Sequence, residues 1–383
     1  MSNIPKLRFP EFTDAWEKCK LGEVGKTYTG LSGKTKEDFG HGQAKFITYM
    51  NVFGNPIASS SGVDRIEIDS RQNEVKFGDV FFTTSSETPE EVGMSSIWLE
   101  NTENVYLNSF CFGYRPIKIF DPYFFAFYLR SPSIRAKIIL LAQGISRYNI
   151  SKTKMMEQEI SIPTLPEQQK IGNLFKQLDR LITLHKRKWD DVILLKKALL
   201  QKMFPKNGSD FPEIRFPEFT DAWEKCKLGE VIINHSSSNY IQEAKAFGEF
   251  EVIQQGNTPI VGYSNEMPFE NFENVLCFGD HTTSLYKPLT PFLLATDGVK
   301  ILSIKGVQGY FILSFFERYK PNAEGYKRHF SILKKQQGYI PPLPEQQKIG
   351  NLFKQLDHLI TLHKRQHEHY QLLKKALLQK MFV

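Results

Sequence analysis

The chain contains one long segment twice, and this repeat decides the fold. Residues 165–204 read LPEQQKIGNLFKQLDRLITLHKRKWDDVILLKKALLQKMF, and residues 343–382 match them at 33 of 40 positions. Apolar residues recur at three- and four-residue spacing in both copies, which is typical of an α-helix with one apolar seam. The predicted seam residues are Ile171, Leu174, Leu178, Leu181, Leu195 and Leu199 in the first copy, and Ile349, Leu352, Leu356, Leu359, Leu373 and Leu377 in the second.

Each copy of this helical repeat is long enough to act as a spacer. Pro166 and Pro344 suit a first helical turn, where a missing N–H costs nothing. Thr164 and Glu167 have the spacing of a capping box, which the second copy lacks because Pro342 replaces the threonine. About 37 helical residues span roughly 55 Å at the usual rise. This is longer than the core helix of a small domain needs.

A second repeat frames the rest of the chain. Residues 8–24 read RFPEFTDAWEKCKLGEV and recur unchanged as residues 215–231, so two tandem units differ in the stretches 25–164 and 232–342. We expect an α+β protein in which each variable stretch forms an α/β domain with short strands. The predicted domains are 1–164 and 208–342, with spacer helices at 165–207 and 343–383. The predicted elements are strands near 79–84, 105–114, 250–254, 275–278 and 299–304, and a helix within 122–141.

Two nearly identical helices in one chain are natural partners for each other. Pairing about a pseudo-two-fold axis makes them an antiparallel coiled coil that separates the two globular domains. The alternative is that each helix packs only on its own domain. The sustained seam favours pairing.

Composition excludes several classes of protein. The longest apolar run, residues 123–129, is far shorter than the roughly 20 residues that cross a bilayer. The N-terminal segment has no apolar region of a signal peptide, so we expect a cytoplasmic protein without membrane association. The four cysteines, Cys19, Cys111, Cys226 and Cys277, are too far apart in sequence for a metal-binding pair and indicate free thiols.

Candidate catalytic and metal motifs are weak. Gly33-Lys34-Thr35 resembles the end of a phosphate-binding loop, but Tyr28 occupies the position of the first glycine. The sequence 121–124, DPYF, lacks the second proline of an adenine methyltransferase motif and any glycine-rich cofactor loop. His363 and His367 share a helical face, but the first copy has Trp189 in place of the second histidine. We therefore expect no catalytic residues, no metal site and no cofactor in this chain.

The two repeats together resemble the specificity subunit of type I restriction–modification enzymes. The resemblance covers the whole chain and rests on FPEFTDAWEKCKLGEV at 9–24 and 216–231, and PEQQKIGNLFKQLD at 166–179 and 344–357. Further matches are FGDVFFTTSSETPEEVG at 77–93, GISRYNISKTKM at 144–155, FGDHTTS at 278–284 and PFLLATDGVKIL at 291–302.

The resemblance implies a division of labour between subunits. Each variable stretch would be a target recognition domain that reads one half of a split, asymmetric double-stranded DNA target, and the helices would fix the gap. They would also dock two modification subunits, which bind S-adenosylmethionine and methylate adenine N6. Two restriction subunits would add translocation and cleavage that use ATP and Mg. This chain would be non-catalytic.

The candidate DNA-binding residues are polar or basic side chains in loops of the variable stretches. Ser146-Arg147-Tyr148-Asn149 and Tyr326-Lys327-Arg328-His329 precede the helical repeats, and pairing Arg147 with Lys327 places Asn149 beside His329. Glu87 is a candidate acceptor for cytosine N4. The remaining candidates are Tyr49, Asn51, Thr83, Thr84, Ser85, Ser86, Lys152, Lys154, His281, Thr282 and Lys287. Ordinary solvated turns are the alternative for all of these loops.

Two other function classes compete with DNA recognition. One is an enzyme with a degenerate motif, and the other is a coiled-coil adaptor that never touches DNA. The formal net charge of +7 does not decide between them, because the helical repeats carry +9 and the remaining residues −2. The basic excess therefore lies on the helices, where it can face phosphates or acidic partner surfaces.

Overall fold

The computed structural model describes residues 3–206, 208–325 and 327–383 and divides into two compact units. Unit 1 consists of the residues up to Leu184 together with Gln366–Val383, and unit 2 is the continuous stretch His185–Arg365. The final 18 residues of the chain therefore belong to the first unit. The domain limits predicted from the repeats stay a prediction, because these units divide both helical repeats.

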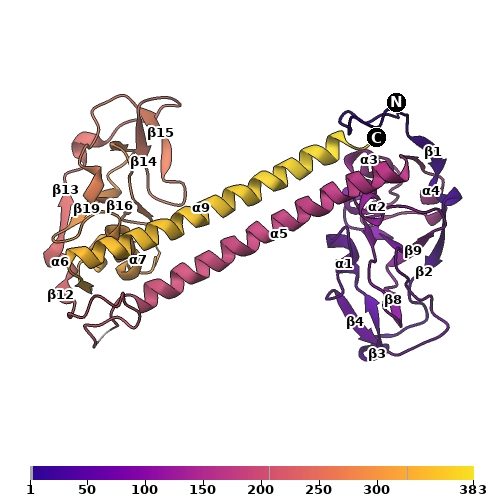
Figure 1. Ribbon diagram of the computed structural model, residues 1–383, viewed down its shortest axis with the longest axis horizontal. Coiled ribbons are helices and arrows are strands. Elements are labelled where there is room, and N and C mark those ends of the chain that lie inside the picture. The colour runs from indigo at the N-terminus through magenta and orange to yellow at the C-terminus, as the bar shows by residue number, and fades with distance from the viewer. Residues whose placement is uncertain (1–2, 207, 326) are drawn as a thin grey trace. The chain divides into compact units, whose positions relative to one another are not determined.

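Unit 1 combines small sheets with short helices (Figure 1). Its four-stranded sheet has the order β2-β9-β5-β7, and a three-stranded sheet has the order β4-β3-β8. The strands are β1 (Glu17–Lys20), β2 (Gly25–Thr29), β3 (Phe39–Ile47), β4 (Val63–Ile66), β5 (Val80–Thr83), β6 (Ser85–Ser86), β7 (Ser95–Ile97), β8 (Val105–Leu107), β9 (Cys111–Pro116), β10 (Tyr148–Asn149) and β11 (Glu159–Ile162). The helices are α1 (Tyr49–Gly54), α2 (Pro122–Leu129), α3 (Pro132–Ile139), α4 (Lys152–Met156) and α5 (Leu165–Lys202), which continues into unit 2.

Unit 2 repeats this topology, although its variable stretch has a different sequence. Its four-stranded sheet has the order β13-β19-β16-β17, and its three-stranded sheet has the order β15-β14-β18. The strands are β12 (Glu224–Lys227), β13 (Ile232–His235), β14 (Phe250–Ile253), β15 (Ile260–Ser264), β16 (Leu276–Gly279), β17 (Leu285–Tyr286), β18 (Phe292–Leu294), β19 (Val299–Ile304) and β20 (Gln337–Ile340). The helices are α6 (Leu228–Val231), α7 (Phe311–Tyr319), α8 (His329–Leu333) and α9 (Leu343–Lys380), which continues into unit 1.

An inner strand of each four-stranded sheet, β5 in unit 1 and β16 in unit 2, is buried on both faces. In β5, Val80 and Phe82 join the core beneath the helices, whereas Phe81 joins a second core on the opposite face. The alternation follows from the two-residue period of a strand. In β16, Phe278 and Cys277 divide between two cores in the same way. Consecutive apolar residues in β5 and β16 therefore indicate a sheet with a hydrophobic core on each face.

The expected helix within 122–141 is two helices, and the expected strand at 105–114 is also interrupted. Pro132 disfavours helical geometry in Ser131 before it, so α2 ends, and the Ser131 side chain caps α3 by accepting from Ile134 N–H. The strand prediction spans β8 and β9, which are separated by a turn in which Asn108 O accepts from Cys111 N–H. Both interruptions follow from local chemistry.

The helices α5 and α9 pack against each other in an antiparallel manner within each unit. In unit 1, α5 residues Asp179 and Ile182 contact Lys374 and His367 of α9, so one residue number falls as the other rises. In unit 2, Lys196 contacts Asp357, and the ring nitrogens Nδ1 of His185 and His363 lie 3.1 Å apart. The predicted pairing is confirmed, and packing on a single domain alone is excluded.

Each unit is completed by the end of the helix that starts in the other unit. In unit 1, Phe382 packs among the rings of Phe124, Tyr128 and Phe175, with centroids 5.4–5.7 Å away. In unit 2, Phe204 packs with Trp223, Phe311 and Tyr319 at 5.5–6.0 Å. The helix ends are therefore core elements as well as parts of a coiled coil.

The seam residues differ in burial. Ile171, Leu178, Ile349 and Leu356 are buried, and Leu174, Leu181, Leu199, Leu352 and Leu377 are half-buried. Leu195, Leu359 and Leu373 are 49%, 38% and 37% exposed. Phe175 and Phe353, which the heptad pattern misses, are fully buried against the cores of their units.

A buried ion pair joins each leading repeat to its following helix. Arg8 Nε and Nη2 donate to the two Glu167 carboxylate oxygens at 2.7 and 2.8 Å, and Arg215 binds Glu345 in the same way at 2.8 Å. Trp16 Nε1 also donates to Glu167 at 3.4 Å. Glu167 is thus committed to a residue far away in sequence, which replaces the expected capping box with Thr164. Among the described residues, no helix is both long and apolar enough to cross a membrane.

Candidate nucleic-acid interface

Unit 1 has a cavity of about 610 Å³ that gathers predicted residues from three separate segments. Tyr49 comes from α1, Ser85 and Ser86 from β6, and Arg147 from the loop before β10. The complete lining is Tyr49, Met50, Phe53, Ser85, Ser86, Glu87, Glu91, Ser146 and Arg147. Six of the predicted side chains therefore share one surface hollow.

A short antiparallel ladder builds one wall of this cavity. Tyr148 lies opposite Ser86, and Asn149 lies opposite Ser85. The loop before β10 is closed by two backbone hydrogen bonds between Gln143 and Asn149, at 2.8 and 3.0 Å. The polar loop at 144–149 is thus fixed to the end of the central sheet. Ser85 and Ser86 are buried beneath it, and Ser86 donates its hydroxyl hydrogen to Thr88 O.

Helix α1 supplies the opposite wall. Thr48 caps the helix by accepting from Asn51 N–H, and the Tyr49 hydroxyl donates to Ser85 O at 2.8 Å. The rings of Tyr49 and Phe53 stack with centroids 5.9 Å apart. Partial burial raises the pKa of Tyr49, so its hydroxyl stays protonated at neutral pH. Met50 is exposed beside these rings.

Three charged side chains in the cavity have no hydrogen-bonding or ionic partner among the described residues: Glu87, Glu91 and Arg147. By contrast, the Asp79 carboxylate elsewhere in unit 1 is paired with Arg115 at 2.7 Å. Unmatched charges of both signs, next to aromatic faces and hydroxyl groups, are available for a polar ligand with donors and acceptors.

Two half-buried arginines hold the backbone of the segments that line the cavity. Arg130 donates to the carbonyl oxygens of Val52, Phe53 and Asn55 at 2.7–2.9 Å, at the C-terminal end of α1. Arg135 donates to backbone carbonyls of residues 90, 92 and 93, behind Glu91. Burial lowers the pKa of each guanidinium to about 10, which leaves both charged at neutral pH. No local sequence pattern predicts that Arg130 and Arg135 bind these carbonyl oxygens.

Other predicted residues of unit 1 serve the scaffold. The Asn51 side chain is buried and donates to the carbonyl oxygens of Ser59 and Gly62 at 2.8 Å. Thr83 is buried, and its hydroxyl oxygen accepts from Met94 N–H. Thr84 donates to Phe110 O. Lys152 lies over the ring of Phe112 at 5.8 Å, and Lys154 is exposed on α4.

The predicted residues of unit 2 divide between support and solvent. The Lys287 ammonium donates to the carbonyl oxygens of Phe272 and Pro288, and burial lowers its pKa to about 8. The Thr282 hydroxyl interacts with Ser284, and His281 N–H donates to Gln255. Lys327 and Arg328 are exposed, and Lys327 pairs with Glu324 at 3.2 Å. Tyr326 lies outside the described residues.

His329 is a buried support rather than a solvent-facing side chain. Its ring lies between Asp280 O, 3.0 Å from Nδ1, and the Glu324 N–H that donates to Nε2. The backbone explains this position, because His329 N–H donates to Asp280 O as Ile150 N–H donates to Thr84 O in unit 1. His329 therefore corresponds to Ile150, and the pairing with Asn149 expected from the sequence is wrong by one residue.

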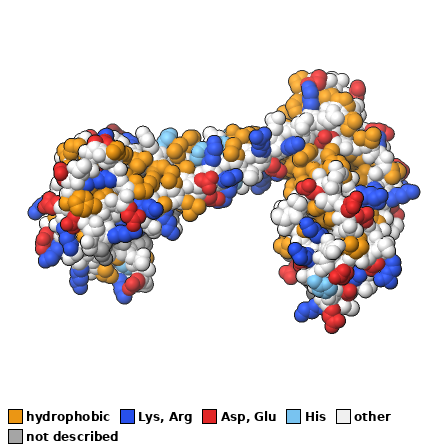
Figure 2. Space-filling model, turned by 60° about the horizontal axis from the view of Figure 1, so that its bottom comes forward, with side chains coloured by type: hydrophobic (Ala, Val, Ile, Leu, Met, Phe, Trp, Pro, Cys, Tyr) orange, Lys and Arg blue, Asp and Glu red, His pale blue; other side chains and the backbone are white. Residues whose placement is uncertain are grey.

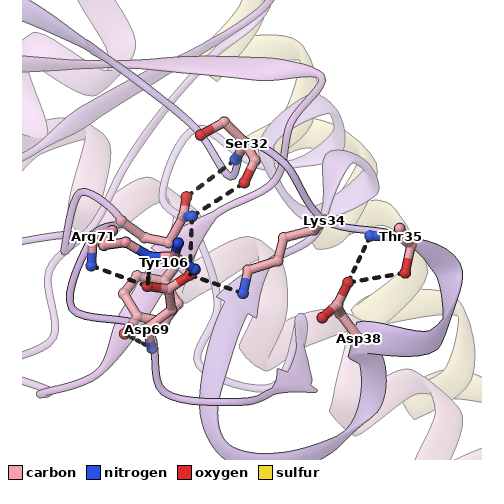
Figure 3. Close-up of polar contacts among 8 residues, drawn as sticks. Ser32, Lys34, Thr35, Asp38, Asp69, Arg71 and Tyr106 are labelled. Carbon is pink, nitrogen blue, oxygen red and sulfur yellow. Dashed lines mark hydrogen bonds and ion pairs between the residues drawn. The ribbon is translucent and has the colours of Figure 1, made fainter.

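The Gly33-Lys34-Thr35 motif has a structural role (Figure 3). Lys34 Nζ lies 3.0 Å from Asp69, whose carboxylate also accepts from Arg71. Hydrogen bonds from Arg71 and Lys34 hold the pKa of Asp69 well below its usual range. Thr35 and Asp38 bind each other at the start of a 3-10 turn. The lysine is thus held by a carboxylate of its own unit.

The helix histidines also have contacts within their units. His185 faces His363 in unit 2, and His367 Nδ1 lies 3.1 Å from Ile182 O in unit 1. The described residues contain no cluster of three or more potential metal-ligating His, Cys, Asp or Glu side chains. Figure 2 shows basic, acidic and hydrophobic side chains interspersed over the visible faces of both globular parts.

The comparisons with known proteins agree in both sequence and fold. The family described as "Type I restriction modification DNA specificity domain" matches residues 13–193 and 220–369. A candidate specificity subunit of the type I restriction enzyme MjaX from Methanocaldococcus jannaschii is 24% identical, with 98% of this chain and 95% of that protein covered.

Solved structures of low sequence identity have a similar fold. The S subunit of a type I restriction–modification system from M. genitalium has a TM-score of 0.66 and 16% identity, with 99% of each chain covered. A chain from a structure concerned with complex assembly and conformational transition of a type I system has a TM-score of 0.51 and 18% identity, with 96% and 97% covered.

Proposed function

Because this chain belongs to the type I restriction–modification DNA specificity family, whose members are non-catalytic, we propose that it reads a bipartite, asymmetric DNA target. One recognition domain, residues 1–164, reads one half-site, and the other, residues 208–342, reads the second half-site. The single observation that carries this proposal is the cavity of unit 1, where three segments gather unmatched charges and hydroxyl groups. Base edges present the donors and acceptors that such side chains bind.

The asymmetry of the target follows from different side chains on one topology. The four-stranded sheets have equivalent orders, and Val80 and Leu276 pair with Tyr114 and Leu302 at equivalent places. Ser85 lies five residues after Val80, and His281 lies five residues after Leu276. The two units therefore present different side chains at the equivalent end of the sheet. Different groups select different bases.

A scaffolding role is supported by exposed leucines at repeated positions of the helices. Unit 1 exposes Leu184, Leu372 and Leu373, and unit 2 exposes the equivalent Leu362, Leu194 and Leu195. Two equal sets of apolar side chains suit two copies of one partner. We assign these sets to two modification subunits, which bind S-adenosylmethionine, and place the restriction subunits with their ATP and Mg on that assembly.

A domain exchange tests this function. The full chain is assembled with its modification subunits, and residues 25–164 are replaced by those of a relative with a different target. Sequencing of methylated adenines is expected to show one new half-site, while the other half-site and the gap between them persist. An unchanged target would favour a pure adaptor. Methylation or cleavage by the isolated chain would favour an enzyme.

A shortened helical repeat tests the spacer role. Removal of seven residues from α5 alone is expected to change the accepted gap or abolish methylation, because one helix then lacks two turns of its partner's length. An active complex with an unchanged gap would contradict this role.

A further inference from the structure

A cation and an anion, Arg147 and Glu87, each adjoin one end of the β6–β10 ladder. The register pairs Asn149 with Ser85 and Tyr148 with Ser86. Arg147 directly precedes Tyr148, and Glu87 directly follows Ser86, so the two residues flank the last pair of the ladder. Both residues line the same cavity, so they offer a donor and an acceptor to one ligand.

The side chains of Arg147 and Glu87 do not stabilise the fold through polar contacts. Both side chains are exposed, both line the cavity, and neither has a hydrogen-bonding or ionic partner within the described parts of the chain. By contrast, the guanidiniums of Arg8 and Arg115 each hold a carboxylate through two hydrogen bonds. Two opposite charges in one cavity that do not pair with each other remain available to a ligand.

The carboxylate of Glu87 limits which groups of DNA can bind in this cavity. DNA is a dense polyanion, so a carboxylate at its surface is repelled by phosphates and is favourable only where it accepts a hydrogen bond. In the major groove, the strong donors on base edges are the amino groups of cytosine N4 and adenine N6. The guanidinium beside it best matches the two acceptors of guanine, O6 and N7. One guanine and its paired cytosine satisfy both side chains.

Hydrogen bonds within the protein fix the backbone near Arg147 and Glu87 before any ligand binds. The Gln143–Asn149 hydrogen bonds close the loop that carries Arg147, and Arg135 holds the segment after Glu87 through the carbonyl oxygens of Glu90 and Val92. Fixed positions favour selection of one base pair over adaptation to several, because little freedom is lost on binding.

We propose that Arg147 and Glu87 together read one G·C base pair in the half-site of unit 1. Arg147 donates to guanine O6 and N7, and Glu87 accepts from cytosine N4. This assignment rests on the proposed function, since it names the base pair that the same cavity takes. The flanking rings of Tyr49 and Phe53 then lie beside the neighbouring base step.

The test uses the full chain in complex with its modification subunits. The target is first determined by sequencing methylated adenines, and the exchange of residues 25–164 identifies the half-site of unit 1. Duplexes with each base pair of that half-site changed singly are then methylated by the unaltered complex and by complexes with Glu87→Gln or Arg147→Gln. Glu103→Gln and Arg65→Gln are matched controls, because both residues are exposed in the same unit.

We expect the variants to lose discrimination at only one base pair of the half-site. The unaltered complex discriminates against replacement of one G·C pair by roughly tenfold or more in kcat/KM. Both variants reduce that discrimination toward unity at that position, while the controls and all other positions keep theirs. A half-site without such a G·C pair, an effect of only one variant, or an equal loss on every duplex would each overturn the assignment.

The outcomes also separate this inference from the proposed function. If exchange of residues 25–164 leaves both half-sites unchanged, the proposed function fails and the base-pair assignment fails with it. If the exchange alters one half-site but no G·C position responds to Glu87 and Arg147, the proposed function stands and only the base-pair assignment is rejected.

Discussion

Lys196 Nζ lies 2.6 Å from Asp357 Oδ1 in unit 2, which joins a lysine of α5 to an aspartate of α9. The same pair is formed a second time in unit 1, between Lys374 of α9 and Asp179 of α5. Residues that occupy equivalent positions of the helical repeat thus exchange partners between the two helices. An antiparallel pair of identical helices produces this reciprocity, because each contact is matched by its counterpart.

The two lysines differ in surroundings, so their removal is expected to differ in cost. Lys196 is 11% exposed and also binds Glu317 at 2.7 Å, whereas Lys374 binds Asp179, which is 36% exposed. Lys196→Ala leaves two part-buried carboxylates without their cation and should lower the free energy of unfolding by about 3 kcal/mol. Lys374→Ala should cost about 1 kcal/mol or less.

Urea unfolding measures both changes, and hydrogen exchange assigns each to its unit. Lys197→Ala is the matched control, because this neighbouring lysine is exposed. Equal losses from Lys196→Ala and Lys374→Ala would show that the extra carboxylate of Glu317 is irrelevant.

The two bidentate pairs at the helix starts are expected to be equivalent. Arg8→Met leaves Glu167 buried without its cation, and Arg215→Met does the same to Glu345; each should lower the free energy of unfolding by about 3–5 kcal/mol. Lys118→Met removes an exposed pair with Glu17 and should cost less than about 1 kcal/mol. Chemical denaturation followed separately for each unit checks this, and a small effect of Arg8→Met would mean that Glu167 finds another partner.

The helix-end phenylalanines should each stabilise the unit into which they pack. Phe382→Ala removes a buried ring from the core of unit 1, and Phe204→Ala does so in unit 2, at a cost of about 3–5 kcal/mol each. Hydrogen exchange should therefore accelerate in α2 for Phe382→Ala and in α7 for Phe204→Ala. Faster exchange in the other unit instead would contradict the assignment of each ring.

Lys287 predicts a pH dependence of stability in unit 2. Burial lowers its folded pKa to about 8, whereas the unfolded value is about 10.4. Between these values the unfolded chain binds one more proton than the folded chain, so the free energy of unfolding rises with pH. Lys287→Met should remove this rise between about pH 8 and 10. Lys335→Met, at an exposed position, should retain it; a slope that survives Lys287→Met would refute the assignment.

The sequence was sufficient for the helices and insufficient for most of the site. Repetition and three–four spacing identify α5 and α9, because both signals are local. Their packing on the cores was missed, since Phe175 and Phe353 lie outside the heptad positions. Glu167 was expected to cap its own helix, but its partner Arg8 lies 159 residues away and no local pattern indicates it.

The cavity shows the same limit at the level of single side chains. The polar segments around Ser85 and Arg147 were recognised from composition, and the sheet brings them together. Met50 and Glu91 also line the cavity, but neither belongs to a local pattern that suggests a site. His329 was misplaced because a one-residue slip in aligning two dissimilar loops exchanges a buried position for an exposed one.

Unit 1 is built from two separate segments of the chain, and this determines when each unit can finish folding during synthesis. Unit 2 is continuous, so all of it has left the ribosome once residue 365 has emerged. Unit 1 needs Gln366–Val383, including Phe382 at its aromatic core, and these residues are synthesised after all of unit 2. Domains usually fold from the N-terminus onward as they are made. In this chain the first unit in sequence is completed only after the second, because its core includes the end of the helix that the second unit begins.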